Sequence, residues 1–246
     1  MSGCAYDVFP AGKGRTMSNL FDKKLTIVIG AYGSGKSEIS VNLALKMRQD
    51  EPSQKILLAD MDIVNPYYRS ADAARILADN NIRLISPSYA GTNVDAPVLG
   101  GEMYVIFDDD SYKGVFDIGG EDMGAVILGS LKSRLAGIDY SLLMAVNINR
   151  PFTSSPEQIA QMSVELAEAA GLKIDGYINN TNLLELTTAA NVREGEDMIL
   201  EASAVTGIPL VMTTMSSDVY DAAVSEGIEF KAPEVVRLTK TIFYNY

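Results

Sequence analysis

The sequence predicts an α/β fold: a mostly parallel central sheet of about seven strands with helices on both faces, forming a three-layer sandwich. Short apolar segments alternate along the chain with longer segments in which apolar residues recur at helical spacing. Strands that alternate with helices in this way pair in parallel through right-handed crossovers. One apolar segment also runs into a glycine-rich loop and then into a helical segment, an order typical of phosphate-binding loops in P-loop NTPases.

The glycine-rich loop GAYGSGKS at residues 30–37 fits the Walker A, or P-loop, pattern G-x-x-x-x-G-K-[ST]. The apolar segment 25–29 predicts a buried strand before it, and residues 38–47 predict a helix after it. The N–H groups of such a loop point at phosphate oxygens, and the helix dipole adds to the attraction. We expect Lys36 to reach the β- and γ-phosphates and to act in catalysis, and Ser37 to bind Mg²⁺. The residues of this segment expected to contact the nucleotide are Gly30, Tyr32, Gly33, Ser34, Gly35, Lys36, Ser37 and Glu38.

The remaining elements follow from the same alternation of patterns. Further strands are expected at residues 55–59, 82–85, 113–117, 140–148, 174–179 and 209–213. Further helices are expected at residues 70–79, 97–108, 123–135, 156–170, 195–206 and 233–243, with a loop at 86–93. The nearly continuous apolar run 140–148 is typical of a strand covered on both faces. Pro156 suits the first turn of a helix.

The chain has 246 residues, 47% of them hydrophobic, which is enough for one large domain with a substantial core. No linker rich in Pro, Gly or Ser divides it, so residues 21–246 are expected to form a single nucleotide-binding domain. Residues 1–20 form an N-terminal extension with little periodicity, expected to be weakly ordered, and Met17 is a candidate natural start. No apolar run approaches the ~18 residues of a membrane span, which predicts a cytoplasmic protein.

Composition excludes several kinds of chemistry. The chain has no histidine, so histidine catalysis and histidine metal ligation are excluded. Cys4 is its one cysteine, so no intrachain disulfide forms. The net charge of −12 argues against general binding to nucleic acid or to anionic membranes.

A P-loop needs an acid beyond another strand end to organise Mg²⁺ and its waters, and Asp117, which closes the strand 113–117, is the candidate Walker B acid. Gly120 lies in a pair of glycines just after it, where a backbone N–H can approach a γ-phosphate and the loop can respond to its loss. An ordinary strand-to-helix turn is the alternative reading.

Asp60 and Asp62 lie one residue apart at the end of the strand 55–59 and therefore face the same side. We expect Asp62 to orient the attacking water and Asp60 to support Mg²⁺ through water. The alternative is a polar strand exit with a turn at Asn65-Pro66.

Asn180 follows the strand 174–179 in the run Asn-Asn-Thr-Asn, at a strand end that commonly carries a base-contacting amide in P-loop proteins. We expect it to contact adenine. GTPases usually show N-K-x-D there, and the acid that reads guanine is absent, which favours ATP over GTP.

The expected helix 233–243 carries apolar residues together with Arg237 and Lys240, and Lys231 lies just before it. It reads either as a small amphipathic membrane helix or, in preference, as a closing helix packed on the sheet.

Three segments together resemble the MinD/ParA/CobQ-type group of P-loop ATPases within the SIMIBI class: GAYGSGKS at 30–37, DMDIVNPYYR at 60–69 and VFDIGGEDMGA at 115–125. The resemblance extends more loosely over about residues 23–215, and is strongest with small uncharacterised ATP-binding members. It implies a mostly parallel sheet of about seven strands, bound Mg-ATP and often a nucleotide-bridged homodimer.

The chain departs from that group in the early part of the P-loop. MinD, ParA and the nitrogenase iron protein carry a further lysine early in the P-loop, which reaches the partner's nucleotide across the dimer. Ala31 and Tyr32 occupy the early positions here. The crossing-lysine mechanism therefore does not carry over, and a homodimer remains one of several arrangements. The iron protein's bridging cysteines are missing too.

The leading functional hypothesis is an ATP-dependent switch whose hydrolysis relaxes the loops 60–69 and 118–124 and changes the affinity for an unidentified protein partner. The transition state needs positive charge beyond Lys36, from Arg69, Arg150 or a partner, and turnover is expected to be slow without it. The alternative is a ligase or kinase that uses ATP on a small-molecule substrate, similar to dethiobiotin and cobyrinate synthetases, with residues 86–100 and 149–155 lining the acceptor pocket. A third is a nucleotide-binding module without useful hydrolysis.

Overall fold

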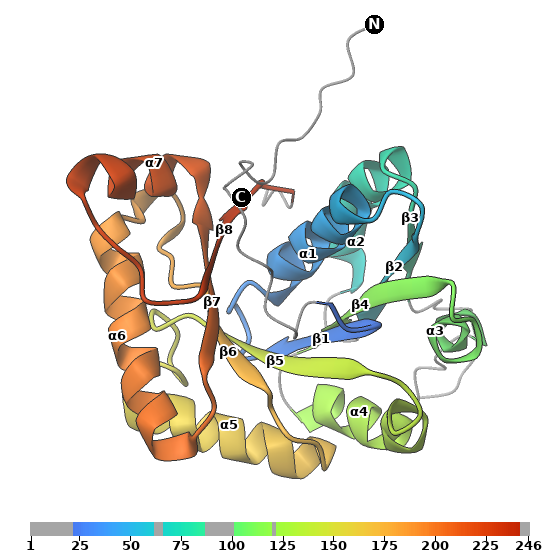
Figure 1. Cartoon of the computed structure of the whole chain (residues 1–246). Helices are drawn as coiled ribbons and strands as arrows, with labels where there is room; N and C mark the ends of the chain where they lie inside the picture. Colours follow the sequence, from blue (N-terminus) through green and yellow to red (C-terminus); the bar gives the residue numbers. More distant parts are fainter. Residues whose placement is uncertain (1–21, 62–65, 87–100, 120–121, 242–246) are drawn as a thin grey trace, which may run out of the picture.

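A central twisted sheet with helices on both faces organises the computed structural model, which describes residues 22–61, 66–86, 101–119 and 122–241 (Figure 1). All eight strands of the described residues are parallel, in the order β3-β2-β4-β1-β5-β6-β7-β8. The strands are β1 (Leu25–Gly30), β2 (Lys55–Met61), β3 (Ile82–Ile85), β4 (Tyr112–Ile118), β5 (Tyr140–Val146), β6 (Gly176–Asn179), β7 (Leu210–Ser216) and β8 (Glu234–Leu238). The predicted parallel α/β fold is confirmed, with one strand more than expected.

The helices form the two outer layers of the sandwich. They are α1 (Lys36–Asp50), α2 (Pro66–Asp79), α3 (Val105–Asp108), α4 (Asp122–Leu135), α5 (Pro156–Ala170), α6 (Ala189–Thr206) and α7 (Ser217–Glu226). Short 3₁₀ turns occupy Gly101–Tyr104 and Leu184–Leu186. In Figure 1, α1 and α2 lie on one side of the sheet and α4 and α5 on the other.

Strict alternation along the strands divides the apolar side chains between two cores. Leu58 and Val115 face α1 and α2, and Leu57 and Phe116 face the layer that includes α4 and α5. Because both faces are covered, the strands are apolar almost throughout, as the run 140–148 predicted.

Local signals explain several helix ends. Ser155 caps α5 by accepting a hydrogen bond from the Gln158 N–H, Pro156 takes the first position, and Gly171 ends the helix in the left-handed conformation. A capping box between Thr188 and Asn191 starts α6. It makes α6 begin at Ala189, six residues before the predicted start.

The predicted closing helix at 233–243 is wrong, because Glu234–Leu238 forms strand β8 and pairs in parallel with β7. Val235 and Val236 are β-branched, and the free edge of β7 offers them a hydrogen-bonding partner that a helix does not have. The hypothesis of an amphipathic membrane helix falls with it. In the described part of the chain, no helix is long and apolar enough to cross a membrane.

Two other helices differ from prediction. The expected helix 97–108 is reduced, among described residues, to the turn Gly101–Tyr104 and α3. Helix α7 was not predicted, although Ser216 caps it by accepting from the Val219 N–H and Gly227 ends it. Much of the predicted loop 86–93 and all of the N-terminal extension 1–20 lie outside the described residues.

Candidate functional site

The glycine-rich loop connects the central strand β1 to α1 at the carboxyl edge of the sheet, as predicted. Strand β1 lies between β4 and β5, so the loop emerges between two covered strands. Gly30, Gly33 and Gly35 all have positive φ, at 147°, 75° and 84°. Gly35 is the N-cap of α1, so the helix begins at Lys36 with its N-terminal N–H groups directed to the loop.

Two of these glycines are required by space as well as by conformation. A Cβ on Gly30 would overlap the Ala145 carbonyl of β5, and a Cβ on Gly35 would overlap the Asn180 side-chain amide. The loop is therefore packed closely against the ends of β5 and β6, and a larger residue at either position would push it away from them.

Lys36 is 3% exposed, and its Nζ donates to the Ala31 carbonyl at 3.1 Å. The ammonium group therefore lies over the loop that precedes it, on the concave side expected to hold phosphates. Tyr32, at the outer end of the loop, is 59% exposed.

The Ser37 hydroxyl is buried and has no hydrogen-bond partner among the described residues, and the same holds for the Ser34 hydroxyl. A buried hydroxyl without a partner is costly, so each is suited to a ligand that the protein itself does not supply. This orphaned Ser37 oxygen fits the predicted Mg²⁺ contact. Among the described residues, no three His, Cys, Asp or Glu side chains are placed so that together they could hold a metal ion, and Mg²⁺ bound with a triphosphate needs few protein ligands.

Asp60 and Asp117 are direct partners in the register of β2 and β4, both buried and both on the face that carries α1. Two carboxylates at adjacent register positions repel each other, and a cation beside them would offset that repulsion. The structure thus brings together two of the predicted acids at the carboxyl edge. The predicted residues Asp62 and Gly120 lie outside the described residues, as do the side chains of residues 66–72, including Arg69.

Asn180 lies under the P-loop, where both ends of its amide are engaged by the protein. Its Nδ2 donates to the Ser34 carbonyl at 2.8 Å, and its Oδ1 accepts from the Thr214 hydroxyl at 2.7 Å. The side chain is 4% exposed. In this arrangement the amide contacts the loop instead of presenting itself to a base, so the adenine contact stays a prediction without support from the geometry.

Arg150 lies at the other side of the loop. Its Nε donates to the Gly33 carbonyl at 3.0 Å, from a compact turn after β5 in which the Arg150 N–H and the Thr153 hydroxyl both bond the Asn147 carbonyl. Of the two arginines that the sequence offered as a source of positive charge, this is the one whose side chain is described, and it contacts the P-loop.

Glu38 has its backbone in the first turn of α1, while its carboxylate faces away from the loop and bonds Thr241 after β8. Sequence reasoning missed this contact, because the segment was expected to be helical and no pattern links positions so far apart.

No protein-family model matches the sequence, and the search of curated proteins finds no match. Among solved structures, the fold is similar to cell division protein FtsY from Thermotoga maritima, with a TM-score of 0.50 and 17% identity over 80% of this chain and 63% of that one. It is also similar to FlhF complexed with GTP and Mg²⁺, with a TM-score of 0.51 and 15% identity over 81% of this chain and 68% of that one. The chain thus spans less than two thirds of the FtsY chain.

Both matches agree with the predicted α/β fold class. At these identities the similarity concerns the fold alone. Neither structure is a MinD or ParA protein, which leaves the finer resemblance as a proposal. The FlhF structure contains GTP, so the preference for ATP also remains a proposal.

Proposed function

We propose that this protein binds and hydrolyses a Mg-nucleoside triphosphate, with ATP as the preferred nucleotide, and acts as a nucleotide-dependent switch on a protein partner. One observation carries the proposal: a P-loop with three left-handed glycines places the buried Lys36 and the orphaned Ser37 hydroxyl at the N-terminus of α1. The paired carboxylates Asp60 and Asp117 at the same edge of the sheet support it.

In this proposal each residue has a distinct task. The P-loop N–H groups and Lys36 bind the phosphates, and the Ser37 hydroxyl, Asp60 and Asp117 hold Mg²⁺ directly or through water. Bound Mg²⁺ would neutralise charge on the phosphate oxygens. Asp62 orients the attacking water, and Gly120 follows the γ-phosphate.

Arg150 is the proposed source of positive charge within the chain, because its side chain contacts the P-loop at Gly33. Charge placed near the transferring phosphoryl group stabilises the transition state. Because Arg150 is engaged by the Gly33 carbonyl, we expect hydrolysis to be slow until a protein partner supplies or releases positive charge at the site.

A protein partner is favoured by exposed apolar side chains on two loops at the carboxyl edge. Phe152 is 64% exposed on the loop after β5, and Leu186 is 78% exposed on the loop after β6. Asn149 Nδ2 links the two loops by donating to the Asn182 carbonyl at 3.3 Å. Stimulation of hydrolysis by a small metabolite instead of a protein would favour the alternative of an ATP-dependent ligase or kinase.

Titration with non-hydrolysable ATP and GTP analogues plus Mg²⁺, followed by calorimetry, tests the proposal. We expect binding that Lys36→Ala abolishes. Lys46→Ala is the matched control, since Lys46 lies on the same helix but pairs with Asp50 at the surface. Preference for the GTP analogue would overturn the ATP assignment, and absence of binding by both would overturn the nucleotide function.

A further inference from the structure

Two successive carbonyls of the P-loop are held from outside the loop. Arg150 Nε donates to the Gly33 carbonyl at 3.0 Å, and Asn180 Nδ2 donates to the Ser34 carbonyl at 2.8 Å. The two donors come from the loops that follow β5 and β6, on the same side of β1 in the sheet. The P-loop is therefore attached to its neighbours through its carbonyl oxygens.

A held carbonyl also fixes the N–H of the same peptide. The peptide group is planar and trans, so its C=O and N–H point in opposite directions. With the Ser34 carbonyl turned to Asn180, the Gly35 N–H is turned the other way, into the loop. Gly35 would otherwise be free to reorient, because glycine pays no steric penalty at positive φ.

The orientation of the Asn180 amide is itself fixed. The Thr214 hydroxyl donates to Asn180 Oδ1 at 2.7 Å, which leaves Nδ2 on the side of the P-loop. The Asn180 N–H bonds the Val146 carbonyl at 2.8 Å, and Thr214 is 1% exposed. The two side chains form a rigid support between β7 and the P-loop.

We propose that Asn180 is a positioning residue for the phosphate groups and not a base-contacting one: held by Thr214, it orients the Ser34–Gly35 peptide so that its N–H faces the triphosphate. The proposal rests on the nucleotide function proposed above and replaces the role predicted for Asn180 from sequence. Base selectivity then comes from other residues.

The test uses a ligand without a base. Magnesium tripolyphosphate is titrated into the full-length protein alongside the ATP and GTP analogues. Asn180→Asp keeps the shape and the acceptor for Thr214 but removes the donor to Ser34. Because it also adds a negative charge near the phosphate site, the uncharged variant Thr214→Val is measured beside it. Asn80→Asp is the matched control, because Asn80 Nδ2 also donates to a backbone carbonyl at 2.8 Å, that of Ile76, at the opposite edge of the sheet.

We expect Asn180→Asp to lower the affinity for all three ligands by a similar factor of about ten or more, since the loss of one well-made hydrogen bond has an effect of this order. We expect tripolyphosphate to shift the Gly35 amide resonance of the wild type, and to shift it less in the variant. Thr214→Val should also lower the affinity for all three ligands by a similar factor. It tests the inference even if Asn180→Asp does not fold. Asn80→Asp should leave all three affinities unchanged.

A loss confined to one nucleotide, with tripolyphosphate binding retained, would return Asn180 to base recognition and overturn the inference. Equal binding of all ligands by wild type and variant would also overturn it. Failure of the wild type to bind any of the three would instead reject the proposed nucleotide function.

Discussion

The Glu38 carboxylate joins the first turn of α1 to the end of the described chain: its Oε1 accepts from the Thr241 N–H at 2.6 Å and from the Thr241 hydroxyl at 3.0 Å. One turn later, Asn42 bonds both the N–H and the carbonyl of Thr239. The segment after β8 is therefore held against α1, the helix that carries Lys36, by hydrogen bonds, and Thr241 is fully buried.

Glu38→Ala should release this segment. Two buried donors lose their acceptor, so we expect the free energy of unfolding to fall by about 1–3 kcal/mol and the Thr241 amide to exchange with solvent faster. Urea denaturation and hydrogen exchange measure the two effects. Glu165→Ala is the control, because Glu165 bonds an exposed side chain on the surface of α5. Unchanged exchange at Thr241 would show that Glu38 does not fasten the segment.

Ser37→Ala tests the metal contact separately from folding. The hydroxyl has no partner among the described residues, so its removal should leave the unfolding midpoint of the ligand-free protein within a degree or two or raise it slightly. The Mg²⁺-dependent part of nucleotide affinity should fall by about tenfold or more. Calorimetry with and without Mg²⁺ measures this difference.

Ser40→Ala provides the matched comparison for Ser37, because Ser40 lies on the same helix and its buried hydroxyl likewise has no partner among the described residues. Ser40→Ala should change neither the unfolding midpoint nor the Mg²⁺-dependent part of nucleotide affinity. An equal loss of Mg²⁺ dependence in both variants would assign the effect to α1 packing.

The P-loop and most of the sheet could be predicted from the sequence because their signals are local. The glycines at residues 30–37 allow the backbone conformation of the P-loop. A buried parallel strand such as β1 is apolar whichever strands pair with it. Strand β8 could not be predicted in this way. Val235 and Val236 suit a helix face or an edge strand, and pairing with β7 decides between them.

The role of Asn180 shows the same limit within the site. The sequence places the Asn180 amide at the end of a strand. An amide at this place could either contact a base or hold the P-loop. Only the positions of Ser34 and Thr214, far away in sequence, distinguish the two. Contacts of this kind depend on how the strands are ordered, which no local pattern encodes.

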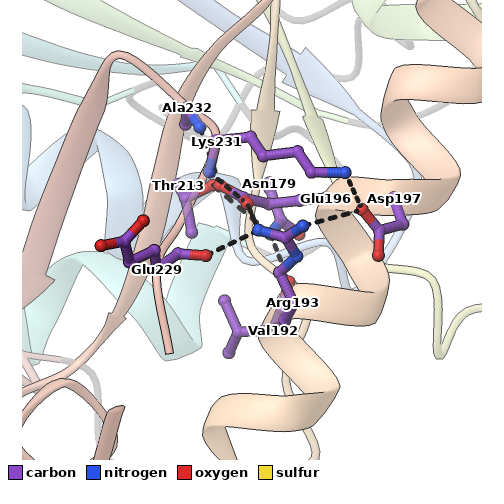
Figure 2. A network of polar contacts seen from close by, with 9 residues as sticks. All are labelled: Asn179, Val192, Arg193, Glu196, Asp197, Thr213, Glu229, Lys231 and Ala232. Atoms are coloured by element: carbon purple, nitrogen blue, oxygen red, sulfur yellow. Dashed lines mark hydrogen bonds and ion pairs between the residues drawn. The ribbon is translucent and has the colours of Figure 1, made fainter. Parts of the chain in front are cut away.

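Glu196 is a second feature without a sequence signal. Its fully buried carboxylate accepts from the Thr213 hydroxyl at 2.7 Å and from the N–H groups of Lys231 and Ala232 at 2.7 and 3.0 Å, joining α6, β7 and the segment before β8 (Figure 2). Arg193 lies 3.7 Å from the same carboxylate. The charge is thus offset by three hydrogen-bond donors and by the guanidinium of Arg193, which also donates to the Glu229 carbonyl and lies 3.5 Å from Asp197.

Glu196→Ala should lower the free energy of unfolding by about 3–5 kcal/mol, because it leaves the Thr213 hydroxyl and the N–H groups of Lys231 and Ala232 without their acceptor and removes a charge partner of Arg193. Glu194→Ala, on the exposed face of the same helix, should change it by less than about 0.5 kcal/mol. Urea denaturation of both variants measures the contrast. Similar values for the two would mean that the network is dispensable for stability.

Asp197 makes the same region sensitive to acid. A hydrogen bond from Lys231 at 2.7 Å, with the nearby Arg193, holds the pKa of its carboxyl below the ordinary value of 3.8. Because the folded state resists protonation, this contribution to stability is present above the ordinary value and is lost as the pH falls through the lower folded value. Its size is below about 1 kcal/mol, since the side chain is half exposed.

Asp197→Asn removes the titrating group, so we expect the variant to be less stable than the wild type at pH 7 and to approach its stability at a strongly acidic pH, as the pH falls through the lowered folded pKa. Urea denaturation of both proteins at the two pH values measures the difference, and high salt should shrink it at pH 7. A stability gap that stays constant down to the lower pH would mean that Asp197 acts through packing and not through its charge.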